Sequence, residues 1–226
     1  MGPADRPGGA VLDAVLFDMD GTLVDSERVW GIALTELAVH AGGTLSETAR
    51  LAMVGTSMAL SMQIFRDDLG QPDRPEAPDV TWLTDRVFEL FGDGLVWRPG
   101  AAELLLAVRA AGIPTALVTS TGRRLAEVAL KTIGAENFDA VVCGDEVDKP
   151  KPDPEPYLRA AELLGVDITR CVAIEDSPSG TASALAAGAA VLAVPAELEL
   201  PPTVGVHLRS SLVGVDLPFL AALLSR

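Results

Sequence analysis

The 226-residue sequence has little positive charge, and this limits the partners that it can bind. Lys and Arg number 17 against 32 Asp and Glu, which gives a formal net charge of −15. Nucleic-acid binding needs a basic surface, so we expect no nucleic-acid partner, and an anionic membrane surface is disfavoured for the same reason. If the substrate is an anion, a metal ion, a lysine or a helix amino terminus must attract it locally.

Long apolar runs are missing, and cysteine is scarce. No run approaches the roughly 18 apolar residues of a membrane span, and residues 1–9 contain Pro and Gly but no apolar signal-peptide core. Cys143 and Cys171 are the only cysteines, and both lie in apolar, strand-like runs. This pattern is typical of reduced thiols in a protein core, so the sequence predicts a cytoplasmic protein without a membrane span.

Short apolar runs alternate with helical patterns in the second part of the chain. We predict strands at residues 115–120, 138–143, 171–174 and 189–194, a weaker edge strand at 206–208, and an earlier strand at 11–17 in the same sheet. Strand–helix alternation is typical of a parallel sheet covered by helices on both faces. The sequence therefore predicts an α/β fold with a Rossmann-like parallel sheet.

The segment between the first two predicted strands shows helical patterns only. Val29, Ala33 and Leu37 lie on one helical face, and Thr44 with Glu47 forms a capping-box pattern for another helix. Residues 71–79 contain three prolines and are predicted as a loop. We therefore expect a catalytic core of residues 1–25 and 97–226, with a helical cap of residues 26–96 inserted after the first strand.

Two aspartates end the first predicted strand. Asp18 and Asp20 are two residues apart, so in an extended chain both side chains project to the same side, and Gly21 then allows a turn. Such carboxylates can hold a divalent cation, attack as a nucleophile or move protons. An Asx-turn that only closes the strand is the alternative.

The other predicted strands also end in polar or acidic residues. These residues are Thr119 and Ser120, then Asp145, then Glu175 and Asp176. Ligands bind at the carboxyl ends of strands in open parallel sheets, so the repeated pattern indicates a site rather than separate turns. Only three lysines occur, and Lys149 and Lys151 lie in a proline-rich loop just beyond a strand end, where one of them can direct a positive charge into the acidic cluster.

These motifs together resemble those of the haloacid dehalogenase superfamily, in particular its phosphatases with a helical cap, such as phosphoglycolate phosphatases and β-phosphoglucomutase-like proteins. The matching stretches are Asp18-Met19-Asp20-Gly21-Thr22-Leu23, Val118-Thr119-Ser120, Lys151-Pro152-Asp153-Pro154 and Ile174-Glu175-Asp176-Ser177 with Gly180. They occur in the family's order and span essentially the whole chain.

The resemblance implies a role for each of these residues. Asp18 would be the nucleophile that forms an aspartyl-phosphate, and Asp20 the general acid and base. Thr119 or Ser120 would bind the transferring phosphate oxygens, and Lys151 would stabilise the nucleophile and the developing charge. Mg²⁺ would be held by Asp18, the backbone carbonyl of Asp20 and Asp176, with Glu175 close by or acting through water.

The Lys-Pro-x-Pro spacing fits both Lys149 and Lys151. We favour Lys151, because the continuation Lys-Pro-Asp-Pro-Glu-Pro-Tyr-Leu resembles the family more closely. Asp20 argues for phosphoryl transfer, since the dehalogenases lack this second aspartate. Residues 1–130 contain no lysine, which excludes the Schiff-base route of the phosphonate-cleaving members.

A β-phosphoglucomutase-like mutase is the closest alternative. Trp30 and Met58 stand where the mutases carry a histidine and an arginine, and Arg50, Arg66 and the loop 55–57 remain candidates for binding a second phosphate. A catalytically silent binding module on the same fold is the alternative of another class. We expect a Mg²⁺-dependent phosphatase that acts, as a monomer or homodimer, on a small phosphorylated metabolite.

Overall fold

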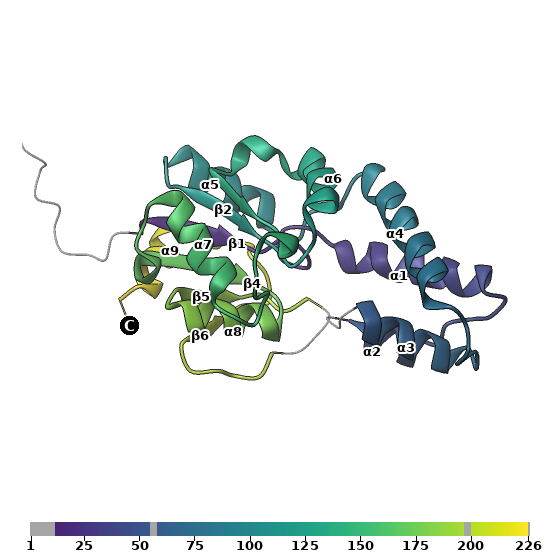
Figure 1. The fold of residues 1–226 in the computed structure, drawn as a ribbon. Helices are drawn as coiled ribbons and strands as arrows, with labels where there is room; N and C mark the ends of the chain where they lie inside the picture. The colour runs from purple at the N-terminus through teal and green to yellow at the C-terminus, as the bar shows by residue number, and fades with distance from the viewer. Residues whose placement is uncertain (1–11, 55–57, 197–199, 226) are drawn as a thin grey trace, which may run out of the picture.

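The computed structural model describes residues 12–54, 58–196 and 200–225, and it has a parallel six-stranded sheet at its centre (Figure 1). The strands are β1 (Ala14–Phe17), β2 (Thr115–Val118), β3 (Ala140–Val142), β4 (Cys171–Glu175), β5 (Ala190–Ala193) and β6 (Val206–Leu208). They lie in the order β3-β2-β1-β4-β5-β6, and every pair is parallel. The predicted Rossmann-like α/β fold is confirmed. Strands β2 and β3 lie on one side of β1 and β4 to β6 on the other, so the strand order reverses at β1, the place where open parallel sheets bind ligands.

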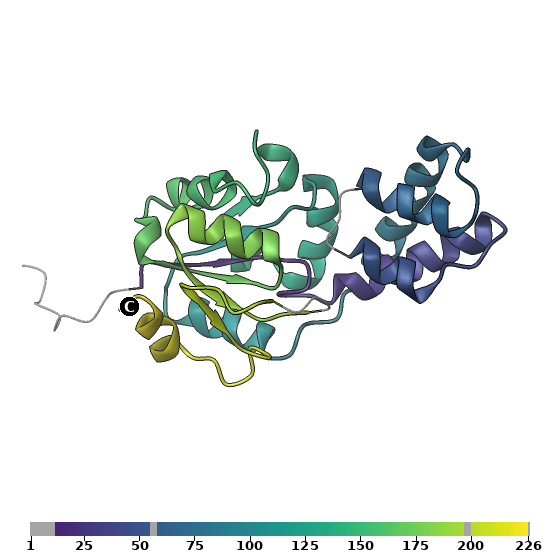
Figure 2. The same cartoon turned by 90° about the horizontal axis from the view of Figure 1, so that it is seen from below.

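Helices cover both faces of the sheet (Figure 2). The apolar core on one face includes α5 (Ala101–Ala110), α6 (Arg123–Ile133) and α9 (Leu217–Leu223), and that on the other includes α7 (Glu155–Leu164) and α8 (Pro178–Ala187). Val15 and Phe17 of β1 belong to the first core, whereas Leu16 belongs to the second, and all three are fully buried. This part also contains short 3₁₀ helices: η1 (Ala135–Asn137), η2 (Gly144–Glu146) and η3 (Ile168–Arg170).

Among the described residues, four helices lie between β1 and α5 in the sequence, beside the carboxyl ends of the strands (Figures 1 and 2). They are α1 (Ser26–His40), α2 (Glu47–Met53), α3 (Met58–Asp68) and α4 (Glu76–Gly92). Leu37, Phe65 and Leu83 are buried among them, and Arg86 of α4 binds Glu36 of α1 at 2.5 Å. The chain enters and leaves this segment side by side, because Asp25 N–H donates to the carbonyl of Val96 at 2.8 Å.

Two local predictions within this segment are wrong. Ser46, not Thr44, caps α2, because its hydroxyl accepts the N–H of Ala49 at 3.1 Å. The predicted loop at 71–79 ends early, since α4 begins at Glu76 and contains Pro78 in its first turn. Proline is tolerated there because the first N–H groups of a helix have no intrahelical acceptor. No helix among the described residues is both long and apolar enough to cross a membrane.

Candidate active site

Asp18 and Lys151 form the centre of the candidate site. Asp18 follows β1 directly, and its N–H donates to the Ile174 carbonyl of the neighbouring strand at 3.0 Å. The Lys151 ammonium donates to Oδ1 of Asp18 at 2.8 Å, to Oε1 of Glu175 at 2.6 Å and to the carbonyl of Val118 at 2.9 Å. The Lys151 side chain is only 3% exposed. Its three donors are thus satisfied, and its position is fixed from three strand ends.

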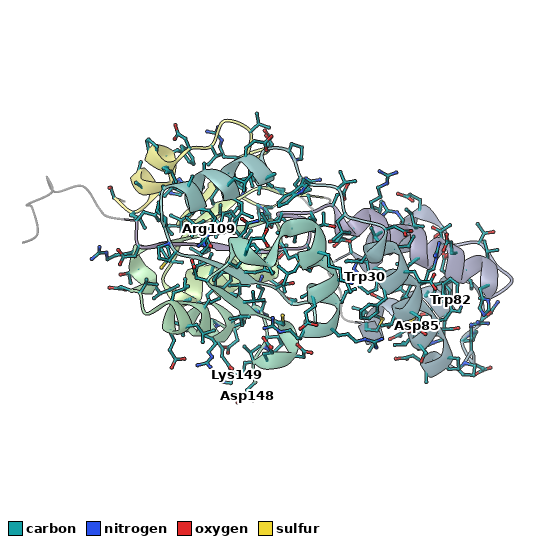
Figure 3. The ribbon with its side chains drawn as sticks, turned by 90° about the horizontal axis from the view of Figure 1, so that it is seen from above. Trp30, Trp82, Asp85, Arg109, Asp148 and Lys149 are labelled. Carbon is teal, nitrogen blue, oxygen red and sulfur yellow. The ribbon has the colours of Figure 1, made fainter. Side chains whose placement is uncertain are left out.

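Lys149 lies elsewhere. Its backbone N–H donates to Glu155 at 3.0 Å, the residue is exposed, and Figure 3 shows it at the edge of the molecule. The geometry therefore favours Lys151 as the lysine of the site. Asp145 is also outside the cluster, because its carboxylate accepts the N–H of Arg123 at the start of α6 at 2.9 Å.

Asp20 is held by hydroxyl groups from the loop after β2. Its Oδ2 accepts the hydroxyl of Thr119 at 3.0 Å and that of Thr121 at 2.8 Å. Thr119 is buried and oriented towards Asp20, while Ser120 and Thr121 line the adjoining pocket. Thr121 was not predicted from the sequence, although its hydroxyl, two residues after that of Thr119, was a usable signal.

Three carboxylates lie close enough together to hold a metal ion. Ligand oxygens of Asp18, Glu175 and Asp176 lie within 4.8 Å of one another. Oδ2 of Asp18 is buried and has no hydrogen-bond partner among the described residues, and the same holds for Oδ1 of Asp20. Oxygen donors with an unpaired, buried carboxylate oxygen are the donor set that a hard divalent cation prefers. The chemistry of these residues therefore fits such a cation.

The charge balance of the cluster supports the same interpretation. Burial, together with repulsion from neighbouring carboxylates, raises the pKa of Asp18 to about 8 and that of Asp176 to about 9. Burial disfavours the ammonium of Lys151, but the carboxylates of Asp18 and Glu175 outweigh it and raise the lysine pKa. One ammonium thus faces several buried carboxylates, and an additional positive charge would stabilise their ionised forms.

Two glycines allow the backbone to approach these carboxylates. Gly21 has φ = +76°, a left-handed conformation, and a Cβ there would collide with the carboxylate of Asp176. Gly180, in the first turns of α8, faces the carboxylate of Glu175, which a Cβ would overlap. Only glycine fits both positions without displacing an acidic side chain.

Tyr157 was not identified from the sequence, although it stands in the stretch that continues from Lys151. Its hydroxyl donates to Oε1 of Glu175 at 2.5 Å, and the residue is completely buried. Burial and the nearby carboxylates raise the pKa of Tyr157 well above its usual range, so the phenol remains a hydrogen-bond donor. The strand-end pattern could not reveal it, because Tyr157 comes from α7 rather than from a strand.

A pocket of about 300 Å³ opens above the carboxylates, between the strand ends and helices α1 to α4. Asp18, Asp20 and Lys151 line its floor, and Trp30 and Arg50 line the opposite wall. Figure 3 shows Trp30 where α1 adjoins the rest of the molecule. The volume suits a small molecule, with the acidic cluster at one end.

The comparisons with known proteins agree with this geometry. A family model of the haloacid dehalogenase-like hydrolases matches residues 12–188. Hexitol phosphatase A of Escherichia coli strain K12 is 36% identical over 190 residues, which cover 82% of this chain and 84% of the relative. The phosphorylated carbohydrates phosphatase of Thermotoga maritima is 35% identical over 182 residues, which cover 78% and 82%.

A solved structure gives the same result. CbbY from Rhodobacter sphaeroides, determined in complex with phosphate, superposes with a TM-score of 0.79 at 27% identity, covering 93% of this chain and 99% of that one. The chain belongs to the haloacid dehalogenase-like hydrolases, and within this family it is a phosphatase that cleaves phosphoric monoesters.

Proposed function

We propose that the protein hydrolyses a phosphorylated sugar or sugar alcohol through an aspartyl-phosphate on Asp18, with Mg²⁺ as its metal ion. The observation that carries this proposal is the Asp18 carboxylate: Lys151 orients one of its oxygens, and the other has no hydrogen-bond partner among the described residues. Relatives at about one-third identity are phosphatases of hexitols and of phosphorylated carbohydrates, which supports this substrate class.

In the first step, the Asp18 carboxylate attacks phosphorus and the bond to the ester oxygen breaks. Asp20, protonated at this stage, gives its proton to the departing alkoxide. Thr119 and Thr121 hold Oδ2 of Asp20, which leaves Oδ1 to carry the proton. The ammonium of Lys151 balances the negative charge that remains beside the phosphoryl group.

In the second step, water attacks the aspartyl-phosphate. Asp20, now ionised, takes the water proton, the bond between phosphorus and Asp18 breaks, and inorganic phosphate leaves with the Asp18 carboxylate restored. Asp18, Asp176 and the backbone carbonyl of Asp20 would hold Mg²⁺, with Glu175 beside them, and the ion would neutralise phosphate oxygens when bound. Ser120 lines the pocket, and in this proposal its hydroxyl donates a hydrogen bond to the transferring group.

We assign residues 26–96 as a cap and residues 1–25 and 97–226 as the catalytic core. Support comes from the pocket, whose walls derive from both parts, with Trp30 and Met58 on the cap side. The two chain crossings between core and cap, joined by the hydrogen bond from Asp25 to Val96, would serve as the hinge when the cap moves. Closure of such a cap would exclude bulk water while the phosphoryl group is transferred.

The main alternative is a phosphomutase, which must bind a second phosphate on the cap. Arg50 lines the pocket, but its guanidinium is engaged by Glu47 at 2.9 Å. Arg66 binds Glu76 at 2.9 Å instead, and the loop 55–57 lies outside the described residues. Arg50 and Arg66, the two cap arginines considered for a second phosphate, are thus each paired with a carboxylate, which favours hydrolysis.

The test is product analysis with a panel of sugar and sugar-alcohol monophosphates, with Mg²⁺ and with EDTA. The proposal predicts that inorganic phosphate is released only when Mg²⁺ is present, and ³¹P NMR detects the release. Conversion of a sugar phosphate into an isomer without phosphate release would instead identify a mutase. No turnover across the panel would favour the silent binding module.

Two further proposals concern the setting of the reaction. We propose a cytoplasmic location, supported by the two buried, free thiols of Cys143 and Cys171, which suit a reducing compartment. We also propose that the protein acts as a monomer or homodimer. Size-exclusion chromatography with light scattering distinguishes these states from larger assemblies.

A further inference from the structure

A chain of short hydrogen bonds leads from the Asp18 carboxylate into the protein core and ends at Tyr157. The Lys151 ammonium links Asp18, at 2.8 Å, to Oε1 of Glu175, at 2.6 Å. The same Oε1 accepts the hydroxyl of Tyr157 at 2.5 Å. The ammonium also lies 5.3 Å from the centroid of the tyrosine ring. A single carboxylate oxygen thus holds both the lysine and the phenol.

This chain is shielded from water between Lys151 and Tyr157. Tyr157 and Glu175 are fully buried, and the Lys151 side chain is 3% exposed. A buried carboxylate depends on its protein donors, because bulk water cannot replace one that is lost. Hydrogen bonds to an ionised acceptor are also about twice as strong as neutral ones. The phenol is therefore a substantial part of what orients Glu175.

The other oxygen of Glu175 is held less tightly. Its Oε2 lies 3.3 Å from the N–H of Asp176 and 3.3 Å from the hydroxyl of Ser177, both longer than the contacts of Oε1. The carboxylate is thus oriented mainly by Lys151 and Tyr157. Without the phenol, Glu175 could rotate about its terminal bond, and the lysine would move with it away from Asp18.

We propose that Tyr157 is a positioning residue for phosphoryl transfer, which fixes Glu175 and, through it, the Lys151 ammonium against Asp18. The inference rests on the proposed role of Asp18 as the nucleophile. Tyr157 acts through two other side chains and is not among the described residues that line the pocket. Its loss is therefore expected to lower kcat and to leave KM for the substrate nearly unchanged.

The first experiment compares Tyr157→Phe with Thr181→Val in the Mg²⁺-loaded enzyme. Each variant removes one buried hydroxyl, but the hydroxyl of Thr181 has no hydrogen-bond partner among the described residues. We expect Y157F to lower kcat about tenfold or more with KM unchanged, and T181V to match wild type. Thermal unfolding controls for stability, since a merely structural role would lower Tm and leave kcat well below Tm unaffected. An unchanged kcat in Y157F would overturn the inference.

The second experiment needs no turnover and no variant at position 157. Tyr157 is the only tyrosine in the chain, so incorporation of 3-fluorotyrosine gives a single ¹⁹F NMR resonance. We expect Asp18→Asn to shift this resonance, because Asp18 is joined to the phenol through Lys151 and Glu175. Asp20→Asn is the matched control, since Asp20 is held by Thr119 and Thr121 instead. Equal shifts in both variants, or none in D18N, would contradict the chain.

The two experiments separate this inference from the proposed function. Absence of phosphate release by the wild-type enzyme would refute the proposed function, and the ¹⁹F measurement would still decide the hydrogen-bond chain. An active wild-type enzyme whose kcat survives Y157F would refute the positioning role alone.

Discussion

The ammonium of Lys151 donates a 2.8 Å hydrogen bond to Oδ1 of Asp18, although the two residues are 133 positions apart in the sequence. Asp18 directly follows β1, and Lys151 lies in the loop that precedes α7, so the parallel sheet brings them together at the edge where its strands end. Both side chains are nearly inaccessible to solvent. The pair explains how a carboxylate surrounded by other carboxylates is held in one orientation, as the nucleophilic role that we propose for Asp18 requires.

Replacing Lys151 by Gln should lower kcat about a hundredfold to a thousandfold, because the variant loses the charge that balances the transferring phosphoryl group. It should also lower the free energy of unfolding by about 3 kcal/mol, since Asp18 and Glu175 lose a buried partner. Lys149→Gln is the matched control, two residues away on the protein surface. Steady-state kinetics and chemical denaturation measure both effects, and equal losses in the two variants would contradict the assignment of Lys151.

Mg²⁺ should stabilise the protein more strongly at alkaline than at acidic pH. Asp18 and Asp176 have pKa values raised to about 8 and about 9 from an ordinary 3.8, so the metal-free folded state binds more protons than the unfolded state. Without metal, the contribution of these groups to stability is therefore highest below the ordinary pKa and falls as pH rises towards the raised values.

Because Mg²⁺ competes with protons for the same carboxylates, its stabilising effect should grow over that pH range. Differential scanning calorimetry with saturating Mg²⁺ and with EDTA measures the difference, which should reach about 3 kcal/mol when Mg²⁺ exceeds its Kd a hundredfold. The Asp176→Asn variant should lose most of this difference. A shift in Tm that is the same at all pH values would contradict binding at these carboxylates.

Gly180→Ala should lower stability and activity together. A Cβ at this position overlaps the carboxylate of Glu175, so the gain in helix propensity is outweighed by overpacking of about 1–3 kcal/mol. Gly92→Ala provides a control, because Gly92 ends α4 and a Cβ there meets nothing within 4 Å. We expect G92A to be as stable as wild type or slightly more so. If G180A behaves like G92A in Tm and kcat, the close approach of α8 to Glu175 is not required.

Much of this architecture could be predicted from the sequence, because the predictive signals are local. Buried parallel strands are continuous apolar runs, and the residue that follows each run marks the carboxyl end of its strand. Asp18, Thr119 and Asp176 could therefore be placed together at the carboxyl edge of the sheet. Helix ends were less certain. Thr44 and Ser46 are both good capping residues. What distinguishes them is a tertiary contact, in which the Ser46 hydroxyl donates a hydrogen bond to Oδ1 of Asp68 at 2.6 Å.

Contacts between helices and strands could not be predicted in the same way. Tyr157 reaches Glu175 only because α7 packs against the sheet. The hydrophobic periodicity of α7 does not specify how closely the helix packs or which strand residue its tyrosine contacts. Thr121 contacts Asp20 through the conformation of a loop. The sequence of the cap predicts even less about the site. Its helical patterns show which faces are apolar but not which side chains contact a substrate.

Identification of the phosphorylated residue during turnover tests the central claim most directly. The enzyme is quenched with acid while it turns over a sugar phosphate in the presence of Mg²⁺, and its peptides are analysed by mass spectrometry. We predict an adduct of one phosphoryl group on Asp18, absent from Asp18→Asn, which should be folded but inactive. A phosphoryl group on another residue, or full activity of D18N, would contradict the account.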